Sequence, residues 1–378
     1  MTTFTVYFCG TGSNKFDDTN DDYWNGELVS TLASNNLGRE FAEWIQIDGP
    51  GSGNLQDDEL WVQSGEHYKL TGISLGYGWK ENVKHALHIM KGDFDWQREK
   101  LTKEQYHILK KHGIPIQDVE KTGSFFWRHY DYGSREITQQ KLQQQIIKIF
   151  RKDDVLPTQV NLIGWSRGGI SCHMLANAML SDPVLESVPV NIFAIDPVPG
   201  PLNFQQDKVS LGKNVKEYVA FYARDERSKG FSCVIPETEK STAVHIYPMP
   251  GRHATLVGNA SLSGGSGGDK HLSEPGMIVR HFAEVCLSRW GVNQSDTLDL
   301  DDGSLLALYK SMRKHADLYK KMHGYSYTIF TEKDAGERLV SYGKKGANFS
   351  SIKGDEFSPS TGLTSDLLAD RFIYEIIK

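Results

Sequence analysis

A serine stands between two glycines in the segment GWSRG, with Gly164 and Gly168 placed two positions either side of Ser166. The pattern G-x-S-x-G is typical of a nucleophilic serine on a sharp turn between a strand and a helix, where larger side chains at the glycine positions would collide. The apolar run QVNLIG precedes this segment, and residues 170–180 follow it with helical spacing. This context predicts that Ser166 is a nucleophile on such an elbow. The alternative is an ordinary tight turn between a strand and a helix.

A nucleophilic serine needs a histidine base and an acid that orients it, and with this turn the chain order is Ser, then Asp or Glu, then His. Asp196 directly follows the apolar run VNIFAI, and Asp225 follows the next run, YVAFYA, after one arginine. The acid can follow either strand, because a triad is defined by geometry. Asp196 is preferred and Asp225 stays as the alternative. Either could instead be a turn residue at a strand end, and Asp225 could pair with Arg224 or Arg227.

Among the histidines, His253 is expected to be the general base. It follows the run AVHIY within the segment PMPGRH, where proline and glycine predict a loop. His271, after a glycine-rich segment, is the second candidate. His245 lies within a strand pattern and His173 lies on the helix after Ser166, so both are expected to be structural.

Backbone N–H groups are expected to bind the oxyanion that forms during acyl transfer. One donor is Arg167, at the start of the helix that follows the serine. The other is Thr11, in the segment Gly10-Thr11-Gly12 that follows the apolar run FTVYFC. In hydrolases with this elbow a second donor comes from a loop after an earlier strand, and glycines there allow the backbone to approach a substrate.

The candidate catalytic residues are expected to be positioned by apolar strands that alternate with helices along the chain. Strand patterns occur at residues 4–9, 44–48, 159–164, 190–195, 218–223 and 243–247. Helical patterns occur at residues 80–90, 137–150, 170–180, 276–290 and 305–322. The alternation predicts an α/β fold of the α/β-hydrolase type, with a mostly parallel sheet and helices on both faces. We expect a catalytic domain over residues 1–290 with an insertion at about 94–132, and a helical C-terminal elaboration over 291–378 packed on the same domain.

Composition excludes several classes of function. The 378 residues carry a formal net charge of −6, which gives no basic footprint for nucleic acid. No apolar run approaches the roughly 20 residues needed to span a bilayer. The first residues lack the basic and apolar regions of a secretory signal, so synthesis in the cytoplasm without a signal peptide is expected.

Metal and cofactor chemistry has no support in the sequence. Cys9, Cys172, Cys233 and Cys286 form no CxxC pair and are expected to be buried, reduced thiols. The acidic segment at residues 17–22 lacks the glycine and the terminal glutamate of a calcium loop, so a solvated loop is expected and calcium binding stays open. No metal or organic cofactor is predicted.

Several segments together carry a resemblance to a known family. They are FCGTGSN, IDGPGSGN, GISLGYGWKENV, LIGWSRGG, AIDPVPG, YARDERSKGF and MPGRHATLVGN. In these segments, and in their order, the chain resembles the α/β-hydrolase domain of bacterial type VI secretion lipase effectors and related hydrolases. The resemblance implies that Ser166 and His253 are catalytic and that the Thr11 loop serves the oxyanion. The segment AIDPVPG also resembles the acid loop of pancreatic-type lipases, which favours Asp196. Cys9 departs from the family, which commonly has aspartate there.

The expected function is therefore hydrolysis of carboxylic esters, by a phospholipase that acts as an antibacterial secreted effector at a target-cell membrane or periplasm. The resemblance implies phospholipid as substrate, and an immunity protein and a component of the secretion machine as partners. The alternatives are a soluble esterase or amidase acting on small molecules, and a non-catalytic binding protein with a hydrolase fold. Aromatic or amphipathic segments around Trp79, at residues 125–127 and at residues 305–322 could contact lipid, although ordinary packing is the preferred interpretation of each.

Overall fold

The computed structural model describes residues 2–49, 79–91, 120–122, 129–131, 156–264, 272–327 and 336–348. The predicted helix at residues 137–150, the aromatic segment at 125–127 and His271 lie outside the described residues, as does most of the predicted insertion.

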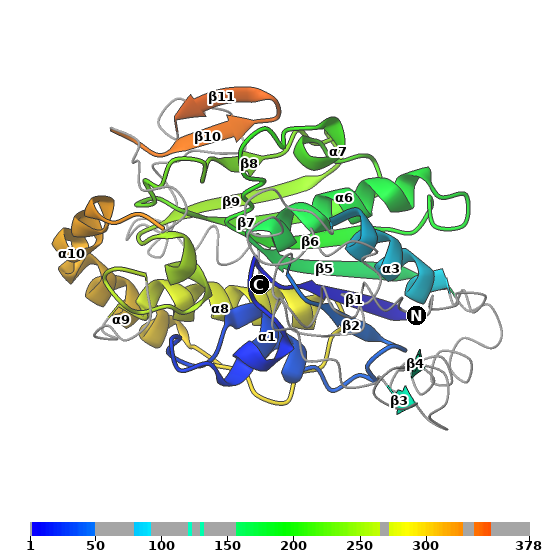
Figure 1. The fold of residues 1–378 in the computed structure, drawn as a ribbon. Helices are drawn as coiled ribbons and strands as arrows, with labels where there is room; N and C mark the ends of the chain where they lie inside the picture. Colours follow the sequence, from blue (N-terminus) through cyan, green and yellow to red (C-terminus); the bar gives the residue numbers. More distant parts are fainter. Residues whose placement is uncertain are drawn as a thin grey trace.

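A six-stranded parallel sheet forms the centre of the molecule (Figure 1). Its strands are β1 (Thr3–Phe8), β2 (Trp44–Ile47), β5 (Gln159–Trp165), β6 (Val190–Ile195), β7 (Val215–Ala223) and β9 (Ala243–Met249). Their order across the sheet is β2-β1-β5-β6-β7-β9, and every neighbouring pair is parallel. All carboxyl ends therefore meet at one edge of the sheet.

The strand order reverses direction between β1 and β5. The chain runs outward from β1 to β2 on one side, and from β5 through β6 and β7 to β9 on the other. In open parallel sheets, ligands bind in the crevice outside the carboxyl ends at this switch point. The loop after β1 contains Thr11, and β5 leads into Ser166, so both predicted elements of the site lie at the switch point.

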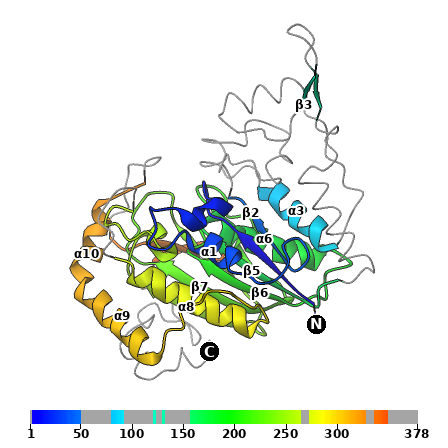
Figure 2. The same cartoon turned by 90° about the horizontal axis from the view of Figure 1, so that it is seen from below.

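Helices cover both faces of the sheet (Figure 2). Helices α3 (Trp79–Lys91) and α6 (Arg167–Ser181) lie on one face, and α1 (Leu28–Ser34) and α8 (Glu274–Arg289) lie on the other. Successive residues of β6 accordingly enter different cores: Ile192 packs with α3 and α6, whereas Phe193 packs with α1 and α8. Coverage on both faces explains why β6 is apolar at most positions and fully buried. The predicted α/β fold with helices on both faces is confirmed.

The described helices after α8 share the hydrophobic core that α8 forms with the sheet. Helix α9 (Asp302–Lys314) lies against α8, and α10 (Ala316–Lys321) follows it, so the amphipathic segment predicted at residues 305–322 is divided at His315. Five apolar side chains of this segment are buried in the core on the face of the sheet that α1 and α8 cover. They are Leu305, Tyr309, Met312, Tyr319 and Met322. Ordinary packing therefore accounts for this side of the segment.

A second, small sheet was not predicted from the sequence. It consists of β8 (Cys233–Ile235), β10 (Leu339–Tyr342) and β11 (Lys345–Asn348), in the order β11-β10-β8. Strand β10 is parallel to β8 and antiparallel to β11. This pairing brings the C-terminal residues 336–348 next to the segment that links β7 and β9.

The remaining described elements are short. They are η1 (Lys15–Thr19), β3 (Glu120–Thr122), β4 (His129–Asp131), α7 (Gln206–Val209), η4 (His253–Val257) and η5 (Met322–Gly324). Within the described ranges, no helix has the length and apolarity required to cross a bilayer.

Candidate active site

Ser166 occupies a strained turn between β5 and α6. Its backbone has φ 59° and ψ −124°, a conformation that side-chain-bearing residues rarely adopt. A Cβ atom on Gly164 would lie 2.4 Å from the carbonyl carbon of Gly168, and one on Gly168 would lie 2.2 Å from the carbonyl oxygen of Phe8. Both positions therefore require glycine. The same steric requirement is the reason why the pattern G-x-S-x-G predicts an elbow.

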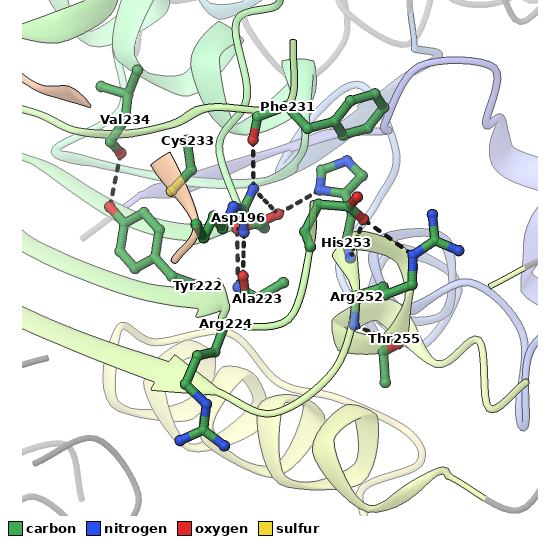
Figure 3. A network of polar contacts seen from close by, with 12 residues as sticks. Asp196, Tyr222, Ala223, Arg224, Phe231, Cys233, Val234, Arg252, His253 and Thr255 are labelled. Atoms are coloured by element: carbon green, nitrogen blue, oxygen red, sulfur yellow. Dashed lines mark hydrogen bonds and ion pairs between the residues drawn. The ribbon is translucent and has the colours of Figure 1, made fainter. Parts of the chain in front are cut away.

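The ring of His253 is hydrogen-bonded to the Asp196 carboxylate. The Nδ1 atom of His253 lies 2.5 Å from Oδ2 of Asp196, and both side chains are buried (Figure 3). Burial alone would raise the pKa of Asp196, but the neighbouring Arg338 and His253 together lower it, so the carboxylate is ionised. An ionised carboxylate accepts the Nδ1 proton, which leaves Nε2 of the imidazole able to accept a proton.

Ser166 and His253 line one cavity of about 250 Å³ at the carboxyl edge of the sheet. Thr11 and Arg167 also line it, as does the ring of Phe231. The ring of His253 lies 5.2 Å from that of Trp165, the residue before the serine, and 5.2 Å from that of Phe231 in an edge-on arrangement. The aromatic rings confine the imidazole to the wall of the cavity that contains the serine.

Two glycines allow the loop after β1 to lie close to the elbow. A Cβ atom on Gly10 would lie 2.2 Å from the ring of Trp165, and one on Gly49 would lie 1.6 Å from the carbonyl oxygen of Gly10. Thr11 consequently borders the cavity, and its Oγ1 accepts a hydrogen bond of 3.0 Å from Nη1 of Arg167. The two residues predicted to bind an oxyanion thus lie together beside Ser166.

Asp225 has other partners than His253. Its Oδ2 accepts a hydrogen bond of 2.8 Å from the backbone N–H of Gly251, and its Oδ1 lies 2.8 Å from Nε2 of His323. The alternative considered from the sequence, a pair with Arg224 or Arg227, is not the contact observed: Asp225 pairs with His323, in η5. Gly251 has φ 112°, so the turn that presents its N–H to Asp225 favours glycine.

Two further side chains hold the histidine loop, and sequence reasoning did not single them out. Glu226 Oε2 accepts the backbone N–H of His253 at 3.2 Å, while its Oε1 accepts those of Arg227 and Ser228 at 2.9 and 2.7 Å. The Tyr327 hydroxyl accepts the next backbone N–H, that of Ala254, at 3.1 Å. The only signal for Glu226 was its place in the YARDERSKGF segment, whereas nothing in the sequence pointed to Tyr327.

Arg338 was also missed. Its guanidinium is buried against Asp196, with Nη1 2.6 Å from Oδ1 and Nη2 2.9 Å from Oδ2. It comes from the segment before β10, which lies 142 positions after Asp196 in the chain. A single arginine in a polar stretch gives no sequence signal for such a contact.

The other residues considered from the sequence have structural partners or are buried. His173 contacts the carbonyl oxygen of Lys208 at 2.8 Å and the hydroxyl of Tyr218 at 3.2 Å, and His245 lies 3.5 Å from Glu217. The four cysteines are free and buried, as expected.

The acidic segment at residues 17–22 contributes a helix cap, because the side chain of Asp17 accepts the backbone N–H of Asn14. No group of three or more potential metal-binding side chains occurs among the residues that the structure describes.

Comparison with known proteins found distant similarities to solved structures. No family model matches the chain, and no curated protein matches it. Among solved structures, an uncharacterised protein from Pseudomonas aeruginosa aligns at 12% identity and a TM-score of 0.46, covering 85% of this chain and 53% of that chain. The Tle1 effector bound to the VgrG spike from the type 6 secretion system aligns at 14% identity and a TM-score of 0.32, covering 68% and 50%. The chain thus spans about half the length of each of these structures.

Proposed function

We propose that the chain is a serine hydrolase that cleaves carboxylic esters, with Ser166 as nucleophile, His253 as general base and Asp196 as the acid that orients the imidazole. One observation carries the proposal. A serine on a strained elbow shares a cavity with a histidine whose Nδ1 is hydrogen-bonded to a buried, ionised aspartate. These are the parts that acyl transfer by a serine nucleophile requires.

In the proposed reaction, Oγ of Ser166 attacks the acyl carbonyl carbon as Nε2 of His253 takes the hydroxyl proton. The carbonyl oxygen becomes an oxyanion, which the backbone N–H groups of Arg167 and Thr11 stabilise. Collapse breaks the bond to the alcohol, which leaves with the proton from His253. A water molecule, deprotonated by His253, then attacks the acyl carbon of the acyl-serine. The bond between that carbon and Oγ of Ser166 breaks, His253 returns the proton to Oγ, and the carboxylic acid is released.

Covalent labelling tests this assignment directly. A fluorophosphonate should label the wild-type chain stoichiometrically at Ser166, and Ser166→Ala should abolish the label. Ser171→Ala is a matched control, because Ser171 lies on the same helix with its hydroxyl bonded to the carbonyl of Arg167 at 3.1 Å. Absence of labelling in the folded wild type would favour a non-catalytic binding protein with this fold.

Phospholipid is the proposed substrate class, and the side chain of Arg167 supports it. This arginine borders the cavity beside Ser166 and contributes a positive charge there, although burial lowers its pKa to about 10. A positive charge at the wall suits the phosphodiester of a phospholipid better than a neutral ester.

Arg167→Met keeps the backbone N–H and should reduce turnover of phospholipid vesicles more than turnover of a short neutral ester. Lys208→Met is the control, since Lys208 is a neighbouring cation, 4.3 Å from the Trp79 ring, that is not among the cavity-lining residues. Equal losses on both substrates in Arg167→Met would instead favour a small-molecule esterase.

The biological role we propose is that of an antibacterial effector, with a component of the secretion machine and an immunity protein as partners. The similar segments in the sequence support this role, and one distant structural neighbour is an effector bound to a secretion spike. Directing the chain to the periplasm of a test bacterium should slow growth, whereas Ser166→Ala should not. Equal toxicity of the two forms would argue against ester hydrolysis as the cause.

A further inference from the structure

The carboxylate of Asp196 is shared between a histidine and an arginine. Its Oδ2 lies 2.5 Å from Nδ1 of His253 and 2.9 Å from Nη2 of Arg338. Its Oδ1 accepts hydrogen bonds from Nη1 of Arg338 at 2.6 Å and from the backbone N–H of Ala223 at 3.0 Å. Four hydrogen bonds, from the imidazole, the guanidinium and one backbone N–H, therefore fix the plane of this carboxylate.

Arg338 is itself buried and makes further hydrogen bonds. Its side chain is 2% exposed, and the guanidinium also donates to the carbonyl oxygens of Ala223 and Phe231. Arg338 thus contacts the backbone of Phe231, the residue whose ring packs edge-on against His253. Burial alone would favour a neutral guanidine, but the charge of Asp196 raises the pKa of Arg338, so the group is a cation.

A cation on the far side of the Asp196 carboxylate weakens the electrostatic interaction between that carboxylate and His253. An isolated Asp–His pair stabilises the imidazolium through the full negative charge of the carboxylate. A second cation in contact with the same carboxylate offsets part of that charge. The imidazolium then gains less stabilisation from this carboxylate than it would from the carboxylate of an isolated pair.

We propose that Arg338 is a positioning residue for the Asp196–His253 pair: it aims the carboxylate at Nδ1 and offsets part of the negative charge that this carboxylate presents to the imidazole. The catalytic meaning of this inference rests on the proposed hydrolase function, whereas its electrostatic part concerns the pair itself.

Apart from Arg167, whose positive charge lines the same cavity, the other titratable groups near His253 contact one another or are neutral. Glu226 accepts the backbone N–H of His253, and Nε of Arg252 lies 3.4 Å from the same carboxylate oxygen. Asp225 is engaged by His323, and Arg167 lies across the cavity with its Nη1 on Thr11. Burial raises the pKa values of Tyr23 and Tyr327, so both cavity-lining phenols are neutral. Arg338 is thus the charge that acts on His253 through Asp196.

The experiment is an NMR titration of the histidine rings in the full chain, with the His253 signal assigned by its loss in His253→Asn. Arg338→Met should raise the pH midpoint of the His253 titration by about one pH unit, because opposite and like charges at such distances have effects of this size. The acid limb of kcat/KM on an ester substrate should move upward by the same amount.

Arg227→Met is the matched control. It removes one buried arginine that is bound to the same C-terminal segment, through Nε and the carbonyl oxygen of Gly336 at 2.7 Å, but that makes no hydrogen bond to Asp196. Its His253 midpoint should stay near that of the wild type. Equal shifts in Arg227→Met and Arg338→Met would overturn the proposal, as would an unchanged midpoint in folded Arg338→Met.

If Arg338→Met does not fold, Arg338→Lys tests the proposal in its place. Lysine retains the charge but cannot form the bidentate contact, so the midpoint should stay near wild type while kcat falls by about tenfold through poorer alignment. An unchanged kcat would remove the positioning role, and a midpoint raised by about one pH unit would remove the electrostatic role. Failure of the hydrolase proposal would be recognised separately, as absence of fluorophosphonate labelling in the wild type.

Discussion

Gly168 lies so close to β1 that a Cβ atom on it would be 2.2 Å from the carbonyl oxygen of Phe8. The clash is with the backbone of β1, which pairs with both β2 and β5, so neither partner can move away cheaply. The first turn of α6 is therefore pressed against β1, which brings the serine elbow and the Thr11 loop together.

Gly168→Ala should lower the free energy of unfolding by about 1–3 kcal/mol through overpacking. Equilibrium urea denaturation measures this, with Gly303→Ala as the control. Gly303 lies in the first turn of α9, where an added Cβ would meet its nearest neighbour at an ordinary 3.5 Å. That control should be neutral or slightly stabilising, and similar losses in both variants would contradict the packing argument.

Ser166→Gly should be more stable than Ser166→Ala. The backbone at this position has φ 59°, which costs a residue with a Cβ on the order of 1–3 kcal/mol, while glycine adopts such angles freely. Glycine also loses more entropy on folding, so the expected net gain is about 1 kcal/mol in urea denaturation. Both variants should lose fluorophosphonate labelling. A less stable glycine variant would show that the elbow is not strained.

The two candidate acids should respond differently to loss of charge. Asp196→Asn should lower kcat by roughly 10⁴-fold, because the new amide would stabilise the wrong tautomer of His253. Asp225→Asn should cost less than about tenfold in kcat and should act mainly on stability. Its carboxylate binds His323 and the N–H of Gly251 rather than the imidazole. Steady-state ester hydrolysis compares them, and a reversed order would move the acid to the strand end of β7.

The stability contributed by Glu217 should depend on pH. Burial alone would raise the pKa of this carboxyl, but hydrogen bonds from His245, Arg289 and Trp290 lower it to about 2. The folded state therefore binds its proton less tightly than the unfolded state, whose value is 4.5. This contribution is present above about pH 4.5 and is lost as the pH falls toward 2.

Glu217→Gln should accordingly destabilise the protein by up to about 3 kcal/mol at pH 7. The difference from wild type should shrink as the pH of the urea titrations is lowered from 5 toward 2. A difference that did not vary with pH would show that packing, and not charge, is what the substitution removes.

Local patterns were sufficient to predict the central sheet from the sequence. The strand predicted at residues 190–195 coincides with β6, and the glycines at 164 and 168 predicted the elbow, because both depend on neighbouring residues alone. The amphipathic segment at 305–322 was read as continuous. It is divided where Nδ1 of His315 and the hydroxyl of Tyr319 both reach the buried carboxylate of Glu274, a long-range contact that periodicity does not reveal.

The candidate site could be predicted only in part for the same reason. Asp196 and Asp225 both follow strands, so spacing could not decide which of them reaches the histidine. The fold does so by turning Asp225 toward Gly251, while Asp196 adopts φ 43° and meets the imidazole. Arg338 and Tyr327 reach the site from more than 70 positions beyond His253, where no local motif marks them.

The pairing of β10 with β8 depends on residues that lie late in the chain and are therefore synthesised late. A nascent chain that has emerged as far as residue 290 contains Ser166, Asp196 and His253, yet it lacks both Tyr327 and Arg338. In such a chain the buried carboxylate has no guanidinium beside it, and the histidine loop has no phenol to accept its N–H. Translation therefore produces the proposed catalytic residues first and the residues that hold them last.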